Sequence, residues 1–284
     1  MTDIIQMVVL GAVALSCGLI GPFLVLKRMA MFANSLSHTI LLGIALAFLL
    51  TGGAFFDLSN LLIGAFLAAL MTAFLTGGLI RYFRLQEDAS IGLVFTALFA
   101  AGITVVTLYT RDVHLGIEAV MGNADILQWS DLKFALSLVG LNLAAVLLFY
   151  KQLQLVSFDP NGAKTLGIPA SIFHFLLLFL VATTCIGAFR AVGVLLVLAF
   201  LVGPFLTARL FCHRLPWLLF WTPAIGILAS ICGVLVSRYL FDVFGLALST
   251  GGLVVTMIGL FYIVAQLTSL FFDQHRGAKR AKLR

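Results

Sequence analysis

Apolar residues recur along the chain in long runs, each near the length needed to cross a membrane. A transmembrane helix needs about 20 predominantly apolar residues. The pattern predicts nine such helices, over residues 4–26, 35–51, 58–80, 89–109, 134–150, 170–188, 191–211, 217–237 and 246–271. The segment from Gly187 to Gly193 suits either an outer turn or a break within one irregular span. The count is therefore eight or nine.

Composition agrees with this pattern. Of the 284 residues, 62% are hydrophobic and 10% are charged, whereas soluble domains carry roughly 25% charged residues. We expect an all-α, polytopic transmembrane bundle in which residues 1–272 form one domain. Residues 273–284 would form a basic cytoplasmic tail on anionic lipid. The start of the chain lacks the positive region of a signal peptide, so the first run is expected to stay as a helix.

The net charge of +6 reflects membrane topology and not nucleic-acid binding, because the basic residues lie in short gaps between apolar runs and form no stripe with aromatics. Positively charged short loops stay in the cytoplasm. An amino terminus outside and a carboxyl terminus inside place thirteen basic residues in inner loops: Lys27, Arg28, Arg81, Arg84, Lys151, Lys164, Arg209, Arg214, Arg276, Lys279, Arg280, Lys282 and Arg284. Only four lie outside: Arg111, Lys133, Arg190 and Arg238.

The sequence lacks several motifs that are typical of nucleotide-binding proteins and hydrolases. It has no G-x-x-x-x-G-K-[ST] loop for nucleotide phosphates, and no G-x-S-x-G or H-E-x-x-H motif of a hydrolase. No carboxylate lies deep inside a predicted span, which disfavours a proton-coupled carrier. We therefore expect a protein that is not an enzyme, and any ATP hydrolysis would belong to a partner.

The sharpest polar cluster, residues 27–38, leads from an inner loop into the second span. Asn34 and His38 are four residues apart and share one face of a helix. Imidazole suits zinc, manganese, iron or copper, and an amide oxygen adds a weaker contact. The alternative is that His38 donates a hydrogen bond between helices and that Asn34 caps a helix. His174 lies in an apolar run without polar neighbours nearby, which predicts a satisfied or packed histidine.

The inner loop 158–168 begins with a local helix signal. Asp159 suits the cap position and Pro160 the first helical position. A short helix at this point is either an ordinary loop helix or a cytoplasmic helix that seats in a groove of an ATPase.

Five segments between residues 20 and 210 resemble, in order, motifs of the ABC-3 family of zinc, manganese and iron permeases. The family patterns are R-R-x-x-x-x-x-D-x-x-S-H-x-x-x-x-G, D-x-x-I-G, F-G-x-I-L, D-P-x-x-A-x-x-x-G and V-G-x-L-L-V. The matching segments are residues 28–43, 87–92, 121–127, 158–167 and 192–208, the third with an insertion.

The resemblance implies the fold of the vitamin B12 importer permeases, in a bacterial cytoplasmic membrane. It implies three partners: a cytoplasmic ABC ATPase, an extracytoplasmic metal-binding protein and a second permease, identical or different. The cargo would be zinc, manganese or iron, with no permanently bound cofactor. Two rivals stay open. One is a permease for a metal chelate such as a siderophore or cobalamin, with a wider path less lined by histidine. The other is a gradient-driven secondary carrier.

The resemblance also assigns residues. In the family, the Asp and His of D-x-x-S-H line the translocation path, and the matching residues are Asn34 and His38. Asn34 departs from the family pattern by removing a negative charge, which a different partner permease could supply. The fourth motif marks an ATPase-coupling segment, whose matching residues are Asp159, Pro160, Ala163 and Gly167.

Overall fold

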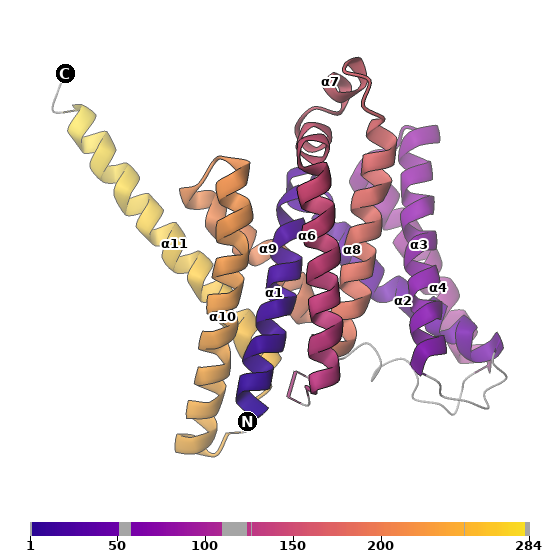
Figure 1. The fold of residues 1–284 in the computed structure, drawn as a ribbon, viewed down its shortest axis with the longest axis horizontal. Coiled ribbons are helices and arrows are strands. Elements are labelled where there is room, and N and C mark those ends of the chain that lie inside the picture. The colour runs from indigo at the N-terminus through magenta and orange to yellow at the C-terminus, as the bar shows by residue number, and fades with distance from the viewer. Residues whose placement is uncertain (1, 51–57, 110–123, 126, 247, 282–284) are drawn as a thin grey trace.

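Every regular element in the computed structural model is a helix, within the residues it describes: 2–50, 58–109, 124–125, 127–246 and 248–281 (Figure 1). The helices are α1 (Thr2–Leu26), α2 (Ala30–Leu50), α3 (Leu58–Tyr82), α4 (Glu87–Tyr109), α6 (Trp129–Phe158), α7 (Pro160–Thr165), α8 (Ala170–Val192), α9 (Val194–Phe211), α10 (Leu215–Phe244) and α11 (Thr250–Ala281). All of these except α7 are long and apolar enough to cross a membrane. The all-α prediction is confirmed, with nine candidate spans in the described ranges.

The uncertain region around Arg190 contains two helices and a one-residue break. Helix α8 continues through Gly187 to Val192, and Gly193 joins it to α9. The backbone angles of Gly193 are φ 87° and ψ 159°, a conformation that is essentially restricted to glycine. The break is therefore narrower than the predicted segment from Gly187 to Gly193.

Helix α1 forms the centre of the bundle. In its spanning part 78% of the residues are buried, against 22% for α4 and 17% for α11. It packs against α6, α8, α9 and α10. Helices α2, α3 and α4 form one side of the molecule, and α11 lies at the other (Figure 1). The helices at the periphery expose apolar side chains that lipid or another chain can cover.

A buried polar cluster ties three helices together at the centre. The Asn142 Nδ2 of α6 donates hydrogen bonds to Ser16 Oγ of α1 at 2.6 Å and to Thr184 Oγ1 of α8 at 2.8 Å. All three residues are buried. No hydrophobic effect drives helices together within lipid, so hydrogen bonds between helices help to hold a transmembrane bundle together.

Helices α2 and α3 touch through their backbones. A β-carbon added to Gly43 would lie 2.2 Å from the carbonyl oxygen of Gly64, and one added to Gly64 would lie 2.4 Å from the carbonyl oxygen of Gly43. Small residues permit such an approach between transmembrane helices. The two helices therefore pack as a close pair.

The two ends of the bundle differ. Helix α7 projects at the end opposite the amino terminus (Figure 1). This end of the bundle, which we call the basic end, carries Lys27, Arg28, Arg81, Arg84 and Lys164. At the other end an ion pair between Asp3 and Arg238 joins α1 to α10.

Candidate translocation path and coupling site

The predicted path residues lie on α2. His38 is exposed on the single chain, and its ring lies against Phe95 and Phe99 of α4, with centroid separations of 5.4 Å and 5.2 Å. Its contacts to described residues are thus aromatic and not a hydrogen bond between helices. Asn34 is half-buried and lies inside α2, four residues after its start at Ala30, so it does not cap the helix.

His38 is thus open on the single chain beside two aromatic rings, and the half-buried Asn34 lies about one turn earlier on the same helix. Within the described ranges, no three His, Cys, Asp or Glu side chains come close enough to hold a metal ion. Part of the third family-like segment, Met121 to Asn123 with Ile126, lies outside the described residues, as does Arg111. In the same segment, Asp125 Oδ1 accepts a hydrogen bond from the backbone N–H of Thr250 at 3.3 Å.

The start of α7 is built as the local sequence predicts. Asp159 Oδ1 accepts hydrogen bonds from the backbone N–H groups of Asn161 at 3.1 Å and Gly162 at 2.9 Å. Pro160 occupies the first helical position, where its missing N–H costs nothing. A β-carbon at Gly162 would lie 2.3 Å from Asp159 Oδ2, so glycine leaves room for the capping carboxylate.

The end of α7 is also closed by backbone hydrogen bonds. The N–H of Gly167 donates to the carbonyl of Lys164 at 3.1 Å, and that of Ile168 donates to the carbonyl of Ala163 at 2.9 Å. This pair of bonds is a Schellman motif, in which the residue after the cap adopts a left-handed conformation that favours glycine. Gly167 occupies that position with φ 76°.

Ala163 connects α7 to its neighbours. It is fully buried and packs with Val156 of α6 and Ala170 of α8. Most of the other residues of α7 are exposed, as are the flanking residues Leu166, at 69%, and Phe158, at 57%. Helix α7 is thus anchored through Ala163 and otherwise open on the single chain.

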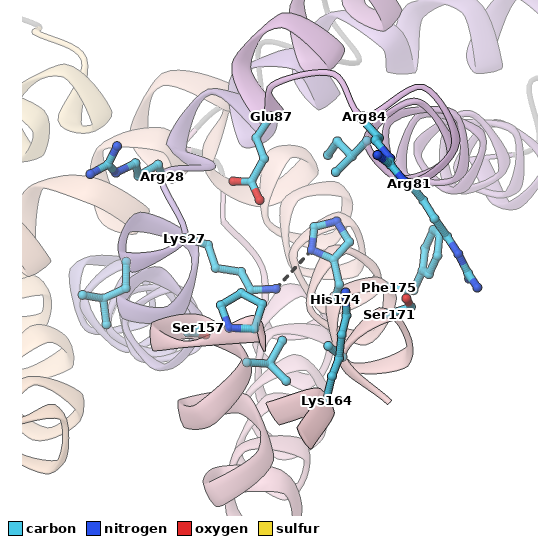
Figure 2. Close-up of a pocket in the computed structure, with 16 residues that line it drawn as sticks. Lys27, Arg28, Arg81, Arg84, Glu87, Ser157, Lys164, Ser171, His174 and Phe175 are labelled. Carbon is cyan, nitrogen blue, oxygen red and sulfur yellow. Dashed lines mark hydrogen bonds between the residues drawn. The ribbon is translucent and has the colours of Figure 1, made fainter. Parts of the chain in front are cut away.

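A cavity of about 570 Å³, which we call the basic pocket, opens beside α7. It lies between the α1–α2 turn, the α3–α4 turn and the start of α8 (Figure 2). Its charged and polar lining residues are Lys27, Arg28, Arg81, Arg84, Glu87, Ser157, Lys164, Ser171 and His174.

His174 is a hydrogen-bonded histidine, and it has a polar neighbour that its place in an apolar run did not predict. Lys27 Nζ lies 3.1 Å from His174 Nδ1, and Glu87 faces the same space (Figure 2). Burial lowers the pKa of Lys27, in the turn between α1 and α2, to about 8, and the Glu87 carboxylate opposes that shift. The signal that could have found the contact is the place of His174, the fifth residue of α8 and therefore close to the basic loops.

Comparison with known proteins covers almost the whole chain. The model of the ABC 3 transport family matches residues 1–269. A probable metal transport system membrane protein of Chlamydia muridarum is 40% identical over 279 residues, which span 96% of this chain and 86% of the relative. The manganese transport system membrane protein MntD of Bacillus subtilis is 37% identical over an alignment of 285 positions, which covers 96% of this chain and 92% of the relative.

A solved structure has the same fold. PsaBC from Streptococcus pneumoniae, in complex with a Fab, superposes with a TM-score of 0.71 at 26% identity. The match covers 92% of this chain and 89% of that chain. The arrangement of helices is therefore shared along nearly the full length of both chains.

Proposed function

The chain belongs to the ABC 3 transport family, and from that premise we propose that it is the membrane-spanning permease subunit of an ATP-driven importer for a divalent transition metal. The observation that carries the proposal is the near full-length match to relatives named as metal and manganese transport proteins. The exposed imidazole of His38 fits such a cargo, because imidazole binds zinc, manganese and iron.

Each permease supplies half of the path. His38 is exposed beside Phe95 and Phe99, so a second permease packed on the α2–α4 side would share its imidazole. Asn34 contributes a neutral amide oxygen to the same helix, and the partner contributes the missing carboxylate. A weak site of this kind suits transport, since the ion must leave as readily as it enters.

Helix α7 is the element on which the ATPase acts. It is anchored to α6 and α8 through Ala163, and most of its other residues are exposed on the single chain. Asp159, Pro160 and Gly167 define where the helix starts and ends, so it can transmit a push as a unit. Closure of a cytoplasmic ATPase would therefore move the basic ends of α6 and α8 together.

The basic end faces the cytoplasm of a bacterial cell, because short positive loops resist translocation. The amino terminus then lies outside, where an extracytoplasmic metal-binding protein delivers the ion. The carboxyl terminus lies inside, and residues 273–284 form a basic tail suited to anionic lipid. Alternating access at the interface of two permeases completes the mechanism.

The test is uptake by vesicles that contain the permease pair, with and without the ATPase. We expect accumulation of Mn²⁺, Zn²⁺ or Fe²⁺ only with the ATPase, the binding protein and ATP. His38→Ala should lower uptake about tenfold, equivalent to about 1.4 kcal/mol on the transport barrier, while assembly survives. His213→Ala is the matched control, since His213 is an exposed histidine after α9.

Three outcomes would contradict the proposal. Uptake without an ATPase would indicate a gradient-driven carrier. Competition by a siderophore or cobalamin, but not by free metal, would indicate a chelate permease. Normal uptake by His38→Ala would remove this side chain from the path.

Asn34→Asp adds the negative charge that the chain lacks at this position and should slow release of a bound ion. A change in the metal concentration that gives half-maximal uptake would reveal the effect.

A further inference from the structure

An apolar groove between α3 and α8 adjoins the basic pocket. This groove has a volume of about 490 Å³ and is lined by Leu70, Met71, Ala73, Phe74, Phe175 and Phe179. Phe175 lines both spaces. At the junction, a β-carbon on Gly77 would lie 2.5 Å from Phe175 Cε1, so glycine is what lets the ring lie against α3.

The pocket has a large excess of positive charge. Lys27, Arg28, Arg81, Arg84 and Lys164 line it, against the single carboxylate of Glu87. The ammonium of Lys27 and the carboxylate of Glu87 are turned toward the centre, whereas Arg28 and Arg81 extend from the rim (Figure 2). An anion held at the centre would therefore meet the Lys27 ammonium, with the Glu87 carboxylate nearby and the guanidinium groups of Arg28 and Arg81 farther out at the rim (Figure 2).

Two of these arginines occupy turns where glycine is preferred. Arg28 has φ 61° and Arg84 has φ 52°, and they are the two non-glycine residues with positive φ in the described ranges. Arg28 closes α1 in a Schellman motif, since its N–H donates to Val25 and that of Met29 donates to Leu24. A residue with a β-carbon is disfavoured there. Strained positions of this kind cluster at functional sites.

Two buried polar groups in the pocket lack hydrogen-bond partners within the described ranges. A protonated lysine only donates, so the His174 Nδ1 accepts from Lys27 and the ring proton lies on Nε2. That Nε2 is buried and has no partner among the described residues, and the same holds for Ser157 Oγ. Buried polar groups are normally hydrogen-bonded, so the Nε2–H of His174 needs an acceptor and the Ser157 hydroxyl needs either a donor or an acceptor.

We propose that the basic pocket and the apolar groove together bind one anionic phospholipid, with its phosphate in the pocket and one acyl chain in the groove. Phosphate offers several acceptor oxygens to arginine and lysine. Basic pockets between transmembrane helices are suited to anionic headgroups. The shared wall at Phe175 favours a lipid over free phosphate, because only a lipid fills both spaces.

The test is lipid binding to the purified, delipidated full-length chain in a neutral detergent, followed by native mass spectrometry and thermal unfolding. Phosphatidylglycerol should bind and raise the unfolding temperature, and phosphatidylcholine should do neither. Lys27→Gln and Arg84→Gln should each weaken binding about tenfold, since each loses a charge-assisted hydrogen bond. Glu87→Gln should strengthen it. Lys151→Gln is the matched control, because Lys151 is an exposed residue of α6 that does not line the pocket.

Separate arms identify the source of the phosphate. Inorganic phosphate and glycerol phosphate should compete only weakly, and binding as tight as that of phosphatidylglycerol would overturn the role of the groove. Equal binding of both lipids, or unchanged binding in both variants, would overturn the site. The assay uses the isolated chain and no metal, so its failure leaves the proposed transport function untouched.

Discussion

The Nζ of Lys27 lies 3.1 Å from the Nδ1 of His174, although 147 positions separate the two residues in the chain. The contact joins the end of α1 to the start of α8 beside α7. It also places an ammonium group in a partly buried site, with Glu87 as the nearby opposite charge. Three segments that are distant in sequence are therefore linked at the basic end.

This contact predicts a pH-dependent stability. Because burial lowers the pKa of Lys27 from 10.5 to about 8, the unfolded chain binds more protons than the folded chain between these values. The free energy of unfolding should then rise as the pH rises from about 8 to 10. Lys27→Met should remove that rise and add about 1–3 kcal/mol at pH 7, an amount limited by solvent screening.

Thermal unfolding in a neutral detergent between pH 7 and pH 10 measures the effect. Lys151→Met is the control, because it removes a lysine from the exposed side of α6 and should leave the pH profile unchanged. An identical profile for wild type and Lys27→Met would show that the lysine ionises as it does in water.

The cluster around Asn142 predicts a loss of bundle stability. Asn142→Ala removes the hydrogen bonds to Ser16 and Thr184 and leaves a small void, which should lower the free energy of unfolding by about 1–2 kcal/mol. Ser137→Ala, on the exposed side of the same helix, should change it by less than about 0.5 kcal/mol. Equal values from denaturant titration in detergent would mean that the cluster adds nothing.

The cap of α7 predicts a coupling defect. Asp159→Ala removes the acceptor of two backbone N–H groups, at a local cost of about 1 kcal/mol. Hydrogen exchange at Asn161 and Gly162 should accelerate, and ATP-driven uptake should fall several-fold. Asp159→Ser keeps an acceptor and should restore both. Unchanged exchange in Asp159→Ala would show that α7 does not depend on its cap.

The break at Gly193 predicts an intolerance of side chains. Gly193→Ala should cost about 1–3 kcal/mol of stability, because the required backbone conformation is nearly exclusive to glycine. In contrast, Gly140→Ala lies inside α6 with no atom within 4 Å of the added carbon, and should be neutral or stabilising by up to about 1 kcal/mol. A thermal unfolding temperature for Gly193→Ala equal to that of wild type would contradict the assigned conformation.

The sequence predicted elements whose cause is local. Nine spans follow from apolar runs, because lipid requires a continuous apolar stretch. The start of α7 follows from Asp159 and Pro160, because a cap acts on the next few residues. Helix α6 was predicted to end at residue 150 but extends to Phe158, with a kink at Phe149. Hydropathy reports only the part of a helix that lies in lipid, so the polar continuation was missed.

The neighbours of the candidate site residues could not be predicted from the sequence, because they come from distant parts of the chain. No local pattern places Lys27 beside His174, or Phe95 and Phe99 beside His38. The pairing of Asn34 with His38 on one helix face was predictable, because it follows from a spacing of four residues. The roles of Asn34 and His38 in transport stay predictions until uptake is measured.

The contact between Gly43 and Gly64 leaves no room for a side chain at either position, so α2 and α3 can pack this closely only while both residues are glycine. Helix α3 also packs on α8. A displacement of α8 would therefore be transmitted through α3 to α2, which carries His38. Helices α2 and α3 would then move together as one rigid pair, and an alanine at either glycine would force them apart.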